Sequence, residues 1–211
     1  MTLTRARTRV PLPAVGVRLA WLASAAIVAT VGCSTPPRVT FWERFGPFDL
    51  EVERYNTLAE MANASDAVVV ARVEQIGEPR VIQGDAAADR VTYIAVHVRI
   101  LRWLRGDTPG IVPLEFLGGT PEKAEAAVRE LRAAMPKEPF VVFLHEKRGA
   151  GEAGLYRPTN SAGLWAASTR SPLDTPLAEA TPQESGVYAG ELAGITSIDG
   201  LINLLDGGTD G

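Results

Sequence analysis

Cysteine, histidine and lysine are scarce in this chain of 211 residues, which has one cysteine, two histidines and three lysines. A single cysteine cannot form an internal disulfide, and no second thiol is present to build a cysteine-rich zinc site. Long apolar runs are missing as well. The longest, residues 19–31, is shorter than the roughly 20 residues that a membrane-spanning helix needs.

The first 32 residues have the composition of an export signal. Residues 1–18 carry four arginines and no acidic residue, and an uncharged, largely apolar segment follows over residues 19–31. A basic region followed by a short apolar region is typical of a cleaved secretory signal. We therefore predict a signal peptide over residues 1–32, with an uncleaved N-terminal membrane helix as the alternative.

Gly32 and the only cysteine, Cys33, follow this apolar segment directly. A small residue before cysteine resembles the lipobox of bacterial lipoproteins, in which the cysteine is diacylated and becomes the first residue of the mature chain. Thr30 stands where those signals usually have leucine. The resemblance implies lipidation of Cys33 and attachment to the extracytoplasmic side of the cell membrane. The alternative is an ordinary secretory peptide with an incidental cysteine.

The chain that remains after such processing is acidic. The whole sequence has 21 basic and 25 acidic residues, and removal of the four arginines in residues 1–32 leaves 17 against 25, a net charge of −8. An acidic protein without a local basic stripe repels nucleic acid. We therefore expect no nucleic-acid partner.

Residues 33–49 are predicted to be a lipid-anchored tether that ends in an aromatic arm. Phe41, Trp42, Phe45 and Phe48 lie within eight positions of one another. Such rings could sit at the headgroup level of a membrane. Packing of the arm onto its own domain is the favoured interpretation, because leading aromatic residues commonly complete a core.

Alternating apolar residues predict a sheet in the middle of the chain. A period of two between turn residues indicates strands near residues 66–76, 90–104, 111–117, 139–146 and 163–168. Helical spacing occurs over residues 50–63 and again from Thr120-Pro121 to Pro136. The expected class is mainly β with flanking helices (α+β). The expected architecture, over residues 50–168, is a small antiparallel OB-like barrel with one inserted helix.

The C-terminal fifth of the chain differs in composition. Residues 169–190 are rich in Pro, Thr, Ser and acid and are predicted to be a linker. An apolar stripe predicts a C-terminal helix within residues 191–206, with Ser197 as its cap, and residues 207–211 are expected to form a frayed tail.

Four segments carry a family resemblance. Ser65–Val73, Val96–Gly106, Phe140–Leu144 and Gly163–Trp165 resemble the strands of a set of exported bacterial proteins. Their barrel is similar to the OB-type barrel of netrin-like modules and tissue inhibitors of metalloproteinases. The resemblance covers residues 65–168 and implies a fold. It does not imply inhibition, because those inhibitors use the free amine of a disulfide-bonded N-terminal cysteine, whereas Cys33 has no partner and lipidation would block its amine.

Aromatic residues on the predicted strands are the candidates for ligand contact. A groove lined by Tyr93, Trp103 and Trp165 would favour a binding module. Trp165 has a second interpretation as a buried structural residue, for which truncation should destabilise the domain.

Motifs that carry catalysis or bind metal are missing. The two histidines, His97 and His145, fall in separate predicted strands. A metal site would require them to meet across strands with a carboxylate such as Glu146, which is a weak candidate. Ser161 and Ser168 have no base nearby in the sequence. We expect no cofactor, no metal and no catalytic residue.

The sequence thus predicts a lipid-anchored, extracytoplasmic binding or interaction module without enzymatic activity. The membrane, through Cys33, and an envelope protein are the expected partners. Two alternatives stay open: an envelope-associated hydrolase whose site is assembled from scattered polar residues, and a purely structural envelope protein.

Overall fold

The computed structural model describes residues 39–46, 54–83, 90–181, 186 and 188–207. The chain divides into two units, Met1–Thr35 and Pro36–Gly211, and all described residues belong to the second unit. The predicted signal segment, Cys33 and Phe48 lie outside the described residues.

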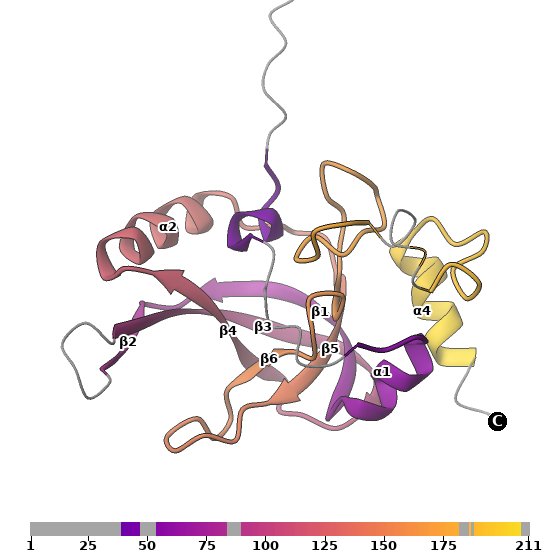
Figure 1. Cartoon of the computed structure of the whole chain (residues 1–211), viewed down its shortest axis with the longest axis horizontal. Coiled ribbons are helices and arrows are strands. Elements are labelled where there is room, and N and C mark those ends of the chain that lie inside the picture. The colour runs from indigo at the N-terminus through magenta and orange to yellow at the C-terminus, as the bar shows by residue number, and fades with distance from the viewer. Residues whose placement is uncertain (1–38, 47–53, 84–89, 182–185, 187, 208–211) are drawn as a thin grey trace, which may run out of the picture. The chain divides into compact units, whose positions relative to one another are not determined.

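The described residues form an α+β fold in which one sheet is flanked by helices, as the sequence predicts (Figure 1). The strands are β1 (Ala67–Ile76), β2 (Arg80–Gln83), β3 (Arg90–Gly106), β4 (Ile111–Gly119), β5 (Phe140–Glu146), β6 (Tyr156–Pro158) and β7 (Leu164–Trp165). The helices are α1 (Leu58–Ala64), α2 (Pro121–Ala133) and α4 (Ile198–Gly207), and a short 3₁₀ turn, η1, covers Trp42–Phe45.

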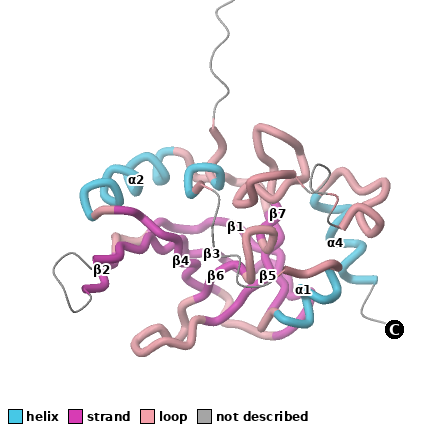
Figure 2. The backbone as a smooth tube through the Cα atoms, viewed as in Figure 1, coloured by secondary structure: helices cyan, strands magenta, loops and turns pink. Residues whose placement is uncertain are grey.

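The strands pair in the order β1-β3-β4-β6-β5-β7, and β1 also pairs with β5. Figure 2 shows these strands in magenta, with α2 on the left of the view and α1 and α4 on the right. All pairings are antiparallel except that between β4 and β6, which is parallel. The short strand β2 lies outside this path and pairs with β3 alone. Strand β1 is therefore bonded on both of its edges.

Strand β3 is long because its sequence alternates over most of its length. Ile94, Val96, Val98 and Ile100 are buried, whereas the residues between them are half-buried or exposed. At its end Gly106 has φ +68, and an added Cβ would overlap the carbonyl of Asp66 at the start of β1. A side chain is excluded there both by the positive φ and by this close backbone approach.

The helices begin at polar caps. The Thr57 side chain accepts a hydrogen bond from the Glu60 amide at 3.0 Å, and the Glu60 carboxylate accepts one from the Asn56 amide at 2.8 Å. This reciprocal arrangement satisfies two free amides at the start of α1. Helix α2 begins after Thr120, with Pro121 in its first turn, as predicted.

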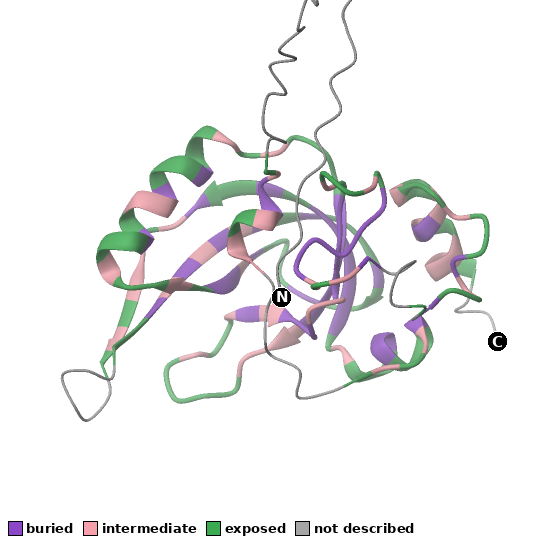
Figure 3. Ribbon diagram, turned by 45° about the horizontal axis from the view of Figure 1, so that its top comes forward, coloured by how far each residue is buried: buried purple, intermediate pink, exposed green. Residues whose placement is uncertain are grey.

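The main core lies between the sheet, α2 and η1. It contains the inward residues of β1, β3, β4 and β5 together with Ala124, Val128 and Leu131 of α2. Figure 3 shows α2 exposed on its outer side, with buried segments along the strands. The aromatic arm joins this core: Trp42 is buried, and Phe45 stacks on Phe116 with ring centroids 4.3 Å apart.

A second core cluster lies under α1 and α4. It contains Val68 and Val70 of β1, Phe143 of β5, Leu58 and Met61 of α1, Leu201 of α4 and the indole of Trp165. The apolar stripe of the C-terminal helix therefore packs on the domain itself, with Leu201 buried and Ile198, Ile202 and Leu205 half-buried.

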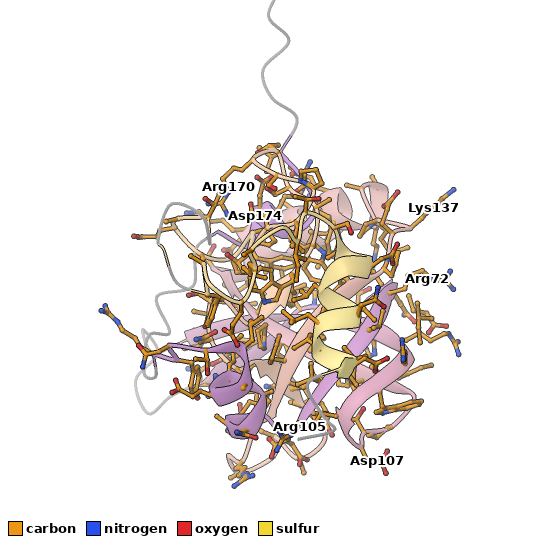
Figure 4. All side chains as sticks on the ribbon, turned by 90° about the vertical axis from the view of Figure 1, so that its right-hand side faces the viewer. Arg72, Arg105, Asp107, Lys137, Arg170 and Asp174 are labelled. Atoms are coloured by element: carbon orange, nitrogen blue, oxygen red, sulfur yellow. The ribbon has the colours of Figure 1, made fainter. Side chains whose placement is uncertain are left out.

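Residues 169–181 differ from the linker that composition predicts. Leu173, Asp174 and Leu177 are buried, and Leu177 belongs to the main core. The Asp174 carboxylate accepts a hydrogen bond from Arg170 at 2.7 Å and a further one from Ser168 (Figure 4). The Arg170 guanidinium also donates to the carbonyls of Thr175, Ala178 and Glu179. This segment is held by an ion pair between the buried Asp174 and the partly exposed Arg170, whose guanidinium also binds backbone carbonyls. Its Pro- and Ser-rich composition does not reveal this pair.

Several predicted boundaries also shift. The C-terminal helix begins at Ile198 rather than 191, because the chain makes turns over 189–194 and Ser197 then accepts from the Gly200 amide. Helix α1 begins at Leu58 rather than 50, and the strand expected over 163–168 is limited to Leu164–Trp165. The sequence pattern does not predict β2, which is short and whose residues alternate between half-buried and exposed.

Candidate functional site

A cavity of about 550 Å³ lies between α1, α4 and the adjoining ends of β1 and β3. Its lining is mostly apolar. The lining residues are Leu58, Ala59, Ala62, Asn63, Val68, Leu104, Arg105, Glu191, Leu204 and Leu205. Volumes of this size and character are typical of sites for small ligands.

Small side chains on α1 leave this space open. Ala59 and Ala62 are three positions apart, so they share one side of the helix and face the cavity together. Leu204 and Leu205 approach from α4, on the far side. Because alanine fills little volume, the two helices can both pack on the sheet without closing the gap between them.

Three polar side chains line the cavity. The Glu191 carboxylate accepts a hydrogen bond of 2.8 Å from the amide of Leu58, the first residue of α1. The Arg105 guanidinium donates to the amide oxygen of Asn63 at 2.5 Å. Figure 4 shows Arg105 near the lower end of α4. The charged guanidinium of Arg105 therefore binds a neutral side-chain amide, whereas the Glu191 carboxylate binds a backbone amide.

The three aromatic candidates do not form a groove. Trp165 is fully buried in the second core cluster, so it cannot touch a ligand in this structure. Trp103 is 43% exposed and donates to Thr108 at 3.2 Å, and Tyr93 lies ten positions away along the same strand. The structural interpretation of Trp165 is the one that its burial favours.

The metal candidates are also separated. His97 lies opposite Pro113 on β4, whereas His145 and Glu146 lie on β5 beside β6. The His145 ring is 3.4 Å from the carboxylate of Asp66. Within the described residues, no group of three or more His, Cys, Asp or Glu side chains is placed to hold a metal ion.

A second polar cluster, which the sequence analysis missed, surrounds Glu115 on β4. The side chain of Glu115 is only 2% exposed, and its two oxygens accept from Arg80 at 2.8 and 2.6 Å and from Lys147 at 2.9 Å. Burial alone would raise the pKa of the Glu115 carboxyl, but these cationic hydrogen bonds outweigh it and hold the pKa below its usual value. Glu115 is thus a buried anion compensated by two cations.

Two more side chains complete this cluster. Glu152, in the turn between β5 and β6, contacts Lys147 at 2.5 Å and Arg80 at 3.8 Å. The Lys147 ammonium lies 4.2 Å from the centroid of the Tyr93 ring, within range of a cation–π interaction. Residues of β2, β3, β4 and the turn after β5 therefore meet here.

Comparisons with known proteins add no assignment. No protein-family model, curated protein or solved structure matches the chain. Among the helices that the structure describes, none is both long enough and apolar enough to cross a membrane.

Proposed function

We propose that this chain is a non-enzymatic, extracytoplasmic binding module and that the cavity between α1 and α4 is its ligand site. The observation that carries the proposal is the cavity itself, a space of about 550 Å³ that combines apolar side chains with the polar Asn63, Arg105 and Glu191. Such a site is the default location for ligand binding in a small domain.

The lining defines the class of ligand. Leu58, Leu204 and Leu205 would contact an apolar chain, and Arg105, whose charge is met only by the neutral Asn63 among its described partners, would pair with an anionic group. The ligand is therefore an amphipathic anion, such as a carboxylate with an alkyl tail.

We also propose that the sheet is an OB-like barrel. An OB fold is a five-stranded, partly open Greek-key barrel. The support is the pairing path β1-β3-β4-β6-β5, which returns to β1 through the β1–β5 pairing, with α2 inserted between β4 and β5.

The proposed location rests on the first 33 residues. Their signal-like composition and the Gly32-Cys33 pair support export, lipidation of Cys33 and attachment to the extracytoplasmic face of the cell membrane. An envelope protein is a further proposed partner.

Titration of decanoate into residues 41–211, followed by NMR, tests the ligand site. Saturable shifts are expected for residues of α1 and α4, and Arg105→Gln should weaken binding about tenfold, because it removes a charge-assisted contact worth about 1.4 kcal/mol. Arg72→Gln, which removes an exposed charge on β1 away from the cavity, is the matched control. Binding that does not saturate, or that Arg105→Gln leaves unchanged, would contradict the proposal.

A further inference from the structure

The two acidic residues of the Glu115 cluster are held in different ways. Glu115 is buried under Arg80 and Lys147 and is fixed by three hydrogen bonds to these two cations. Glu152 comes from the turn between β5 and β6, and its side chain is 19% exposed, more than that of Lys147 at 12% and less than that of Arg80 at 37%. Glu115 is part of the framework, whereas Glu152 is a partly accessible carboxylate that contacts the same two cations.

The side chain of Glu152 can leave without a change in the fold. Its turn is closed by backbone hydrogen bonds, from the Glu152 amide to Gly149 and from the Leu155 amide to the Glu152 carbonyl, at 3.1 and 3.0 Å. These bonds do not involve the carboxylate. Rotation of the side chain alone would therefore remove its contacts with Lys147 and Arg80.

Gly149 holds the space that the Glu152 carboxylate occupies. A Cβ added at Gly149 would overlap this carboxylate. The φ of Gly149 is not in the left-handed region, so alanine is compatible with the backbone. A glycine here is thus explained by the docked side chain and not by the conformation of the turn.

The charges of the cluster balance only while Glu152 is docked. Arg80 and Lys147 contribute two positive charges, and Glu115 neutralises one of them. When Glu152 turns away, one positive charge remains, beside the face of the Tyr93 ring. A single carboxylate restores neutrality, and a flat body attached to it would contact the ring.

We propose that Glu152 occupies the position of a ligand carboxylate, and that Arg80, Lys147 and Tyr93 form a second binding site for an aromatic monocarboxylate. Glu152 then competes with the ligand from within the chain. An attached competitor acts at an effective concentration of roughly millimolar or more, so it weakens the binding of the ligand in the unaltered protein. This site is separate from the cavity between α1 and α4, and neither proposal depends on the other.

Benzoate titrations of the full chain followed by NMR test this site. Glu152→Gln should bind benzoate at least tenfold more tightly than the unaltered protein, with shifts at Tyr93 and Lys147. Gly149→Ala should also tighten binding, since it displaces the Glu152 carboxylate while it preserves the charge. Glu125→Gln, which removes an exposed charge on α2, is the matched control and should leave the affinity unchanged.

Three results would overturn the proposal. One is a Glu152→Gln variant that is folded but binds benzoate no more tightly than the unaltered protein. Another is an equal gain in Glu125→Gln, which would indicate a general effect of net charge. The third is benzoate that binds Glu152→Gln without shifting Tyr93. Acetate, which has the carboxylate but no ring, tests the contact with Tyr93. In the Glu152→Gln background, Tyr93→Leu should weaken the binding of benzoate more than the binding of acetate.

Discussion

Replacement of Trp165 by alanine should destabilise the domain strongly. Its side chain is fully buried, its partner on the neighbouring strand is Val141, and the ring centroid of Tyr188 is 6.1 Å away. Truncation of a buried tryptophan costs about 3–5 kcal/mol of unfolding free energy, a large share of the roughly 5–15 kcal/mol of a typical domain. For a domain of this size, about 2–4 °C of melting temperature is lost per kcal/mol, so we expect a decrease of roughly 6–20 °C.

Two further substitutions, Trp165→Phe and Trp103→Ala, separate the loss of buried side-chain volume from the loss of the indole N–H and from the loss of an exposed ring. The Trp165 indole N–H is buried without a hydrogen-bond partner among the described residues, and phenylalanine removes this donor while it keeps part of the ring volume. Relief of an unpaired buried donor, about 1–3 kcal/mol, offsets much of the lost packing. Trp165→Phe should therefore melt within a few degrees of the unaltered protein.

Trp103→Ala is the matched control. This indole is 43% exposed and makes one hydrogen bond, to Thr108, so its loss should cost about 1 kcal/mol or less. Denaturant unfolding monitored by circular dichroism gives all three free energies. Equal losses for Trp103→Ala and Trp165→Ala, or an unchanged melt for Trp165→Ala, would refute the reasoning and indicate an accessible Trp165 ring.

The remaining predictions concern charge, ionisation and processing. Glu115→Gln should lower the free energy of unfolding by about 2–3 kcal/mol. This is at or below the low end for a broken buried ion pair, because Arg80 is partly exposed and keeps part of its hydration. An unchanged midpoint of urea unfolding at pH 7 would contradict this. The pKa of Glu115 is lowered in the folded state, so its carboxylate contributes to stability above the unfolded pKa, and this contribution is lost as pH falls through the folded pKa. The unaltered protein and Glu115→Gln should therefore converge in stability below about pH 4. Burial raises the pKa of Tyr188 to about 12, so the neutral phenol contributes fully to stability below about pH 10, and this contribution is lost as pH rises toward 12. Tyr188→Phe should therefore reduce the loss of stability at alkaline pH. A spectrophotometric titration in which Tyr188 ionises at the ordinary pKa of tyrosine would contradict this. Cys33→Ser should release the domain from the membrane fraction or stall processing, and intact-mass analysis that finds an unmodified Cys33 in the unaltered protein would contradict lipidation.

Local patterns in the sequence were sufficient where a segment packs through one regular face. The alternation in β3 and the spacing of Ala124, Val128 and Leu131 in α2 each identify an element and its buried side. The cap at Thr120 and the apolar stripe of the last helix were predictable for the same reason. Each depends only on the backbone geometry of a few neighbouring residues.

Composition was misleading where a few residues decide the packing. Residues 169–181 look like a linker, yet Leu173, Leu177 and the ion pair of Arg170 with Asp174 fix them to the domain. An isolated leucine or aspartate has no periodicity, so nothing local distinguishes a buried residue from a solvated one.

Both proposed sites depend on contacts between segments that are distant in sequence. The cavity joins α1 to α4, and the Leu58–Glu191 hydrogen bond across it spans 133 positions. Glu115 occupies an outward position on β4, where alternation predicts solvent, and becomes buried because Arg80 and Lys147 cover it from other elements. The sequence by itself determined the regular elements that pack through one apolar face, such as β3 and α2, since that periodicity follows from local geometry. Only the tertiary structure decided which polar side chains meet, because that depends on how the strands pair.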